Sequence, residues 1–169
     1  MTDKVLSILK EEFNRRLKLE SLSRIEKCIS HLTSEEIWRK NNENTNSIGN
    51  LILHLQGNVE QYISSGIGGE KDVRQRNKEF DSIEKIDKET LVKRLRQTVE
   101  LADEIVSKLQ FDDLAEKKQV QGFEESVLSI IIHVIEHFSY HTGQITYYTK
   151  YIKNIDTGYY AGLDLDVIN

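Results

Sequence analysis

The fold class that the sequence predicts is all-α: one four-helix bundle that forms a single domain over residues 1–169. Three observations lead to this prediction. The chain contains no proline, the residue that breaks helix interiors, so long helices are permitted. Apolar residues recur at gaps of three and four over four long segments, which is the period of an amphipathic helix. Helices with one apolar face must pack against each other, and four of them form a bundle.

Composition and charge limit the possible partners and location. The net charge is -5, and basic residues alternate with acidic ones, so a broad basic surface for nucleic acid is not expected. No apolar run approaches the ~20 residues that a membrane helix needs, and no secretory signal pattern follows Met1. Cys28 is the only cysteine, which excludes an internal disulfide and fits a reducing compartment. We therefore expect a cytoplasmic protein that binds neither nucleic acid nor membranes.

The first predicted helix begins near the N-terminus and ends near His31. Its apolar stripe consists of Leu6, Leu9, Phe13, Leu17, Leu22, Ile25, Ile29 and Leu32. Thr33 followed by Glu36 matches a capping box, which predicts a short helical turn. The polar stretch KNNENTN at residues 40–46 then predicts a loop.

A second helix is predicted from about Ser47 to Ser65. Asn46 or Ser47 can cap its start, and the glycines of SGIGG at residues 65–69 end it. The charged connection over residues 66–86 has room for a turn of helix. It is too long for a tight antiparallel turn, so we allow for a crossover between the second and third helices.

The third helix is predicted to start near Asp87 and the fourth to run from about Glu125 to Lys153. The apolar face of the third consists of Leu91, Leu95, Val99, Ala102, Ile105 and Leu109. A loop over residues 111–123 joins the two. Lysines in the last turn of the fourth helix suit the negative end of its dipole, and Asn154 can terminate it. The tail that follows has no helical period.

Three of the five histidines lie in HVIEHFSYHTGQI, where His133, His137 and His141 follow one another at intervals of four. On a helix, such neighbours differ by about 40° in azimuth and about 6 Å along the axis, so two imidazoles can share one ion. The outer two stand about 12 Å apart along the axis and cannot easily do so. At most one adjacent pair should therefore bind an ion, and a third ligand must come from another helix.

His54 is a candidate for that third ligand. It lies within an apolar run of the second helix, between Asn50 and Asn58, so the three form a polar stripe. A buried polar group is costly unless it is bonded, so the stripe either faces solvent or has a purpose inside the protein, and its apolar neighbours favour the second. The alternative is an ordinary histidine whose hydrogen bonds are satisfied in the core. The zincin pattern does not apply, because Glu136 precedes His137 instead of following the first histidine.

Four stretches of the chain resemble the DinB/YfiT-like superfamily of metal-binding four-helix bundle proteins. They are NSIGNLILHL, ESVLSIIIHVIEHFSYHTGQI, GEKDVRQRNKEFD and VQGFEES. The likeness covers nearly the whole chain and points to a bacterial branch of unknown function, related to bacillithiol- and mycothiol-dependent transferases. The isolated histidine, followed much later by HxxxH and GQI, is the specific part of the pattern. The resemblance implies a DinB-like bundle that forms homodimers.

The resemblance also implies which residues bind metal. The family's ligands are one histidine of the second helix and two of the last, which are His54, His137 and His141 here. His133 would then line the pocket one turn away. Thr142 stands where the family motif often has a basic residue, which changes the charge of the pocket but not the ligands.

Three neutral imidazoles would leave at least one open position on a divalent ion, zinc or nickel, as in catalytic sites. The first hypothesis is a metal-dependent enzyme that transfers a low-molecular-weight thiol such as bacillithiol to a small-molecule substrate. Arg74 and Arg76 are candidates to bind the carboxylates of such a thiol. The second is a metal-dependent hydrolase, for which Glu136 is the nearest acid in sequence. The third is a non-catalytic, metal-stabilised binding or dimeric module.

Each ligand histidine is expected to donate its second ring N–H to a nearby acceptor. The candidates by helical position are Asn50, Asn58, Glu60, Glu136 and Gln144.

Overall fold

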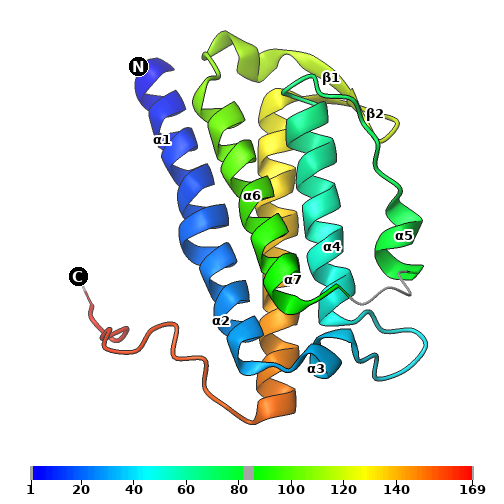
Figure 1. Cartoon of the computed structure of the whole chain (residues 1–169). Coiled ribbons are helices and arrows are strands. Elements are labelled where there is room, and N and C mark those ends of the chain that lie inside the picture. The colour runs from blue at the N-terminus through cyan, green and yellow to red at the C-terminus, as the bar shows by residue number, and fades with distance from the viewer. Residues whose placement is uncertain (1, 82–85, 169) are drawn as a thin grey trace.

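The computed structural model describes residues 2–81 and 86–168, and four long helices packed side by side form its body (Figure 1). The elements of these four helices are, in order, α1 (Thr2–Asn14), η1 (Arg15–Leu22) and α2 (Ser23–His31); α4 (Ile48–Val59) and η2 (Glu60–Ser65); α6 (Lys88–Ser107); and α7 (Val127–Lys153). The predicted all-α four-helix class is confirmed. Among the described residues, no helix is both long and apolar enough to span a membrane.

The chain crosses the length of the bundle between its second and third helices. α4 and α6 pack against each other and run in the same direction, so the connection must return along the bundle (Figure 1). In its described part, residues 66–75 pass down beside α4, and α5 (Arg76–Asp81) packs against α4 outside the four-helix core. The expected crossover and its turn of helix are both present.

Side-chain caps set the beginnings of the helices. Thr33 and Glu36 form the predicted capping box, which opens the short helix α3 (Ser34–Trp38). The Glu36 N–H donates to Thr33 Oγ1 at 3.3 Å, and the Thr33 N–H donates to the Glu36 carboxylate at 2.8 Å. Ser47, Asp87 and Ser126 each accept a backbone N–H three residues on and so cap α4, α6 and α7. Of the two caps proposed for α4, Ser47 is the one used.

The segment expected to be a loop before the fourth helix is partly structured. After the short 3-10 helix η3 (Asp112–Ala115), strands β1 (Lys117–Val120) and β2 (Phe123–Ser126) pair antiparallel, with Val120 opposite Phe123. Gln121 and Gly122 between them have positive φ values of 54° and 85°, which a two-residue type I′ turn requires. Glutamine is not a usual residue at the first turn position, so the hairpin has only a weak signal in the sequence.

The apolar stripes face a common core. Phe13, Leu17 and Ile25 on the first helix and Phe138 on the fourth are almost fully buried. Cys28 is buried among them, and its Sγ lies 3.1 Å from the hydroxyl of Tyr159, which folds back from the tail. The tail beyond Tyr160 extends away from the bundle (Figure 1), and its apolar side chains are exposed.

Gly49 lets α4 approach the indole of Trp38, and we predict that Gly49→Ala destabilises the protein. An added Cβ would lie 2.7 Å from the ring, which is fixed by a hydrogen bond from Trp38 Nε1 to the Ile86 carbonyl at 3.0 Å. Overpacking costs about 1–3 kcal/mol and outweighs the gain of about 1 kcal/mol from alanine in a helix, so the net loss is about 1 kcal/mol. Urea unfolding should show a lower midpoint with an unchanged slope.

Gly143→Ala is the matched control. It also lies within a helix, but no atom lies within 4 Å of the position of its Cβ. It should raise the free energy of unfolding by up to about 1 kcal/mol. Shifts of the same sign for the two variants would contradict the packing argument.

Candidate metal centre

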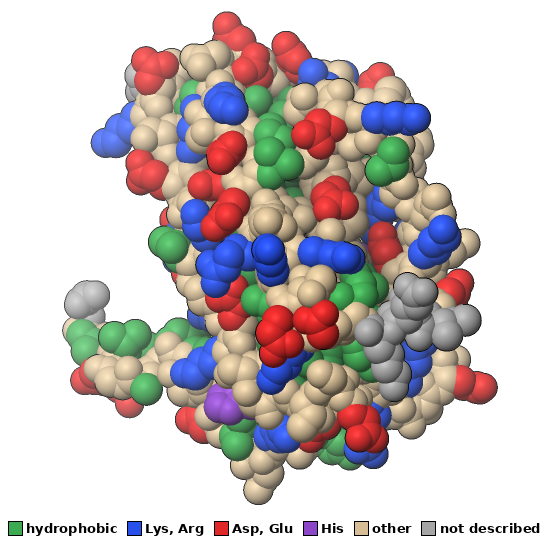
Figure 2. All heavy atoms as spheres, in the orientation of Figure 1, with side chains coloured by type: hydrophobic (Ala, Val, Ile, Leu, Met, Phe, Trp, Pro, Cys, Tyr) green, Lys and Arg blue, Asp and Glu red, His purple; other side chains and the backbone are tan. Residues whose placement is uncertain are grey.

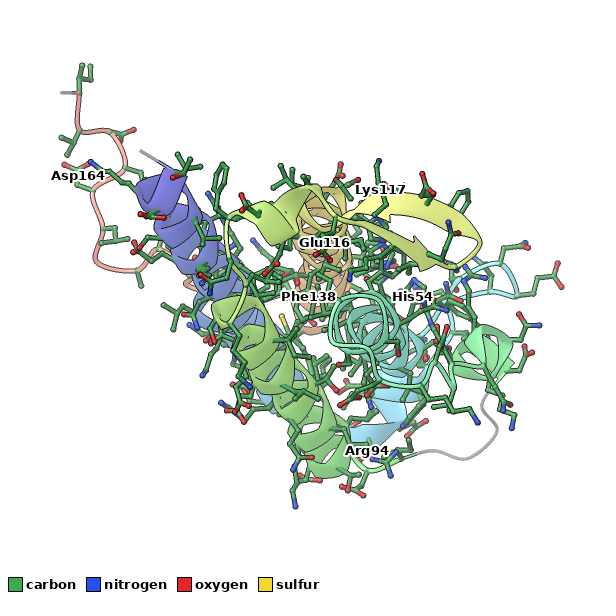
Figure 3. The ribbon with its side chains drawn as sticks, turned by 90° about the horizontal axis from the view of Figure 1, so that it is seen from above. His54, Arg94, Glu116, Lys117, Phe138 and Asp164 are labelled. Carbon is green, nitrogen blue, oxygen red and sulfur yellow. The ribbon has the colours of Figure 1, made fainter. Side chains whose placement is uncertain are left out.

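Three histidines from two helices converge on one point. His54 comes from α4, and His137 and His141 come from successive turns of α7. One ring nitrogen from each lies within 4.8 Å of the others, and the Nε2 atoms of His54 and His137 are 3.0 Å apart. In Figure 3, which looks along the helices, Phe138 lies in the middle of the bundle and His54 lies toward the α5 side of α4. The cluster therefore sits at the α4–α7 contact, near the edge of the core.

The fourth histidine of this region, His133, lies outside the cluster. Its ring stacks on Tyr62 with centroids 4.3 Å apart, and its Nε2 accepts a hydrogen bond from the Asn58 amide at 3.3 Å. Its ring also stacks on His137, at 5.4 Å. His133 thus supports one side of the cluster without pointing a nitrogen into it.

Hydrogen bonds at Nδ1 leave the Nε2 atoms of His54 and His141 free to bind a cation. Nδ1 of His54 is 2.8 Å from a carboxylate oxygen of Glu79, and Nδ1 of His141 is 2.8 Å from Oε1 of Gln144. Each acceptor fixes the proton on Nδ1, so the lone pair of that ring is on Nε2. The separation of 3.0 Å between the Nε2 atoms of His54 and His137 is close to the roughly 3.3 Å between two nitrogens bound at about 2.0 Å to one tetrahedral ion. The residues fit a divalent ion.

Glu79 and Arg74 form a buried ion pair behind His54. The guanidinium of Arg74 contacts both carboxylate oxygens, at 2.6 Å and 3.0 Å, and also donates to Oε1 of Gln61 at 2.8 Å. Burial alone would raise the pKa of Glu79, but hydrogen bonds from His54 and Arg74 and the charge of Arg74 outweigh it and lower the pKa. Glu79 therefore remains ionised and orients His54. Arg74 NH2 also lies 3.2 Å from Nδ1 of His54, a close approach of two donors and not a hydrogen bond.

Sequence reasoning did not find Glu79. It lies 25 residues from His54 on α5, within a charged stretch that lacks a clear helical period. The one available signal was that this stretch, GEKDVRQRNKEFD, belongs to the resemblance. Arg74 was considered as a contact for a thiol's carboxylates, but the structure buries it against Glu79.

Among the five candidate acceptors, Gln144 contacts a histidine of the cluster. The Asn50 amide instead donates to the backbone carbonyl of Glu79 at 2.8 Å, which ties α5 to α4. Glu60 accepts from Gln56 and from Thr98 of α6, away from the cluster. Asn58 contacts His133, as described above, and Glu136 is exposed.

Burial keeps His137 and His141 neutral. It lowers the pKa of His137 to about 3, and the charges that His141, His54 and His133 would carry if protonated add to this effect. Burial also lowers the pKa of His141, partly offset by its hydrogen bond to Gln144. At neutral pH these rings present lone pairs and no charge, as metal binding requires.

Aromatic side chains surround the cluster. The ring centroid of Phe80 lies 5.1 Å from that of His54, and Tyr140 lies 5.0 Å from His141. The guanidinium of Arg76 stands over Phe80 at 5.1 Å. Phe80 is half-buried against His54, whereas Tyr140 is exposed.

The fold and the cluster together define a DinB-like four-helix protein with a histidine cluster compatible with metal binding. A crystal structure of a DinB-like protein from Bacillus cereus superposes with a TM-score of 0.61 over 88% of this chain and 91% of that chain, at 18% identity. That identity shows the fold alone, and it confirms the DinB-like resemblance. Residues 2–160 match the family described as "Protein of unknown function (DUF1572)", so the chain belongs to that family. No curated protein matches it.

We predict that the purified protein holds about one divalent ion per chain and loses it in His54→Ala and His141→Ala, because each removes one of three ligands. Elemental analysis of protein prepared without chelator or affinity tag measures this. His31→Ala is the control, since His31 is an exposed residue at the end of α2 and does not belong to the cluster. An unmodified protein that takes up neither zinc nor nickel would overturn the ligand assignment.

Glu79→Gln tests the group behind His54. We expect it to weaken zinc binding by roughly 10- to 100-fold, because the amide orients the imidazole less strongly than the carboxylate. A competition titration with a chromophoric chelator measures the affinity. Glu136→Gln, which changes an exposed acid between two histidines of α7, should leave the affinity unchanged.

Stability of the metal-free protein should depend on pH through His137. Its folded-state pKa of about 3 is below the usual unfolded value of about 6.5, so between these values the unfolded chain binds more protons. The free energy of unfolding therefore falls as the pH decreases from about 6.5 toward about 3. When the free energy of unfolding is measured with urea in the presence of chelator, it should depend less on pH in His137→Gln than in the unmodified protein. The same pH dependence in both proteins would show that His137 is not its source.

Proposed function

We propose that the protein is a divalent-metal-dependent enzyme whose ion, zinc or nickel, is bound by His54, His137 and His141. The observation that supports this is the convergence of three imidazoles, two of which, those of His54 and His141, already have the outer nitrogen bonded. Structural zinc sites usually have four protein ligands, whereas three leave a position for water or substrate. Among the described residues, no other histidine, cysteine or acid belongs to this cluster.

The reaction we propose is the transfer of a low-molecular-weight thiol, such as bacillithiol, to a small-molecule electrophile. A bound divalent ion would lower the pKa of a coordinating thiol so that it reacts as the thiolate. The chain's own residues hold the ion, and Glu79 fixes the orientation of His54. Phe80 and Tyr140 offer apolar surface to the substrate. Arg76 is exposed beside Phe80 and can bind a carboxylate, since Arg74 is already paired with Glu79.

A hydrolase, the alternative, requires a general base beside the ion-bound water. Glu79 is held by both His54 and Arg74, and Glu136 forms no hydrogen bond with a described residue of the cluster. The arrangement of acids therefore favours the transferase. A non-catalytic module would require the open position to be closed by a partner.

Homodimer formation is part of the proposal. The outer face of α7 carries exposed apolar and aromatic side chains, namely Leu128, Ile132, Tyr140, Tyr147 and Tyr151. A row of this kind on one helix suits a second copy of the same helix. We place the enzyme in the cytoplasm, where low-molecular-weight thiols are kept reduced.

Thiol transfer to an aryl halide tests the proposed reaction. With bacillithiol as donor, we expect a rate that requires added zinc or nickel and that falls to the uncatalysed level in His141→Ala, because the ion is lost. Tyr148→Phe, a change on α7 away from the cluster, should retain activity. Metal-dependent ester hydrolysis without thiol transfer would favour the alternative, and neither activity in the metal-loaded protein would favour the non-catalytic module.

A further inference from the structure

A hollow lies on the Nδ1 side of His54, away from the other two histidines of the cluster. A cleft of about 520 Å³ separates α4 and η2 from residues 70–79 of the crossover, and Arg94 of α6 closes one end. Glu79 and Arg74 form its boundary toward the histidines. Because Glu79 binds Nδ1 of His54 and the ion would bind Nε2 on the opposite edge of the ring, this cleft does not open onto the ion.

Two residues that line the cleft each carry a buried side-chain oxygen that has no hydrogen-bond partner among the described residues. The two atoms are Oε1 of Gln56 and Oγ of Ser64, and Ser64 is only 2% exposed. Beside them, Oε1 of Glu60 accepts from the Gln56 amide at 2.9 Å and from the Thr98 hydroxyl at 3.1 Å. Native proteins rarely leave buried polar atoms unpaired, so these two atoms need a partner, water or a ligand, that the cleft can admit.

The backbone around Ser64 has two unusual features, a π-helical segment and a tight turn after it. Ser64 lies in the π-helical segment η2, and π-turns within helices are frequent at functional sites. The chain then turns back tightly, with the Glu70 N–H donating to the Ser64 carbonyl at 3.1 Å. Gly68 permits this turn, because a Cβ there would lie 2.6 Å from the same carbonyl. The turn brings residues 70 and 71 to the mouth of the cleft.

Both signs of charge meet at the cleft. Lys71 and Arg94 are among the positive side chains that line it, and Glu60 and Glu70 are among the negative ones. None of these four forms an ion pair with another described residue. Figure 2 shows both signs intermixed over the exposed face of the bundle, without a large area of one sign. A ligand that carries only one sign of charge would be repelled by the side chains of that sign. A zwitterion can bind the basic and the acidic side chains at the same time.

We propose that this cleft binds a small zwitterion of the amino-acid or short-peptide class, at a site separate from the metal centre. The ammonium group is held by Gln56 Oε1 and the acidic side chains, the carboxylate by Arg94 and Lys71, and Ser64 Oγ completes the polar contacts. This site goes beyond the proposed thiol transfer and does not depend on it.

An NMR titration of the isotope-labelled full chain with glycylglycine tests the proposal. We expect saturable amide shifts around Gln56 and Ser64 at millimolar or lower concentration, and no such shifts with N-acetylglycinamide, which has the same size but no charge. Equal shifts with both compounds, or no saturable shift with glycylglycine, would overturn the proposal and leave only water to satisfy these atoms.

Variants locate the site. Ser64→Ala and Arg94→Glu should each weaken glycylglycine binding about tenfold or more, because each removes one polar contact. Arg94 is exposed, so its variant keeps the test valid even if Ser64→Ala fails to fold. Ser7→Ala and Lys93→Glu, on other faces, should bind normally. His141→Ala should also bind normally; loss of binding there, with binding retained in Ser64→Ala, would mean that the probe binds the ion and would overturn the proposal.

Discussion

The buried contact of the Glu79 carboxylate with His54 and Arg74 is the interaction on which the rest of the site depends. It joins the crossover to α4 and fixes the tautomer of a histidine that faces α7. Removing one partner of such a buried pair typically costs 3–5 kcal/mol, roughly, because the other charge stays buried without compensation. Gly57 is part of the same contact, since a side chain at that position would collide with the Glu79 carboxylate.

The need to hold Glu79 beside His54 explains why the crossover between α4 and α6 is long. A short turn between α4 and α6 would make them antiparallel and leave no chain to cover the outer side of His54. The longer path places α5 against α4, where Asn50 binds the Glu79 backbone and Phe80 packs on the imidazole. Most of the polar stripe of α4 is thereby bonded: Asn50 and His54 bond to α5, and Nδ2 of Asn58 bonds to His133, while the buried Oδ1 of Asn58 has no partner among the described residues. A helix that is otherwise apolar can therefore carry three polar residues without an open face to water.

The two sides of His54 have different chemistry because imidazole has two different nitrogens. On one side, neutral rings whose pKa values are lowered by burial present lone pairs to a cation. On the other side, charged groups hold the ring and border a polar cleft. A change in the crossover that moves Glu79 would also move Nε2 of His54, so the metal centre and the cleft share one structural support.

Much of the fold was predictable because it is encoded locally. The helical stripes, the capping residues Thr33 and Ser47, and the end of α7 at Asn154 follow from short-range patterns, and the structure has them. The hairpin was missed because its turn begins with Gln121 and its strands pair only with each other. Spacing and resemblance together nominated the three histidines, and the structure brings their nitrogens together. Glu79 and Arg74 could not be predicted in their roles, because a charged stretch has no period that shows which side chains will be buried.

The sequence by itself therefore determined the helices, their boundaries and the types of side chain that each carries. Only the tertiary structure decided that α4 and α6 are parallel, that α5 covers His54, and that Glu79 is the carboxylate at Nδ1. The physical reason is range: caps and amphipathic periods act over one or two turns, whereas the partner of a buried charge is chosen by packing between segments distant in the chain.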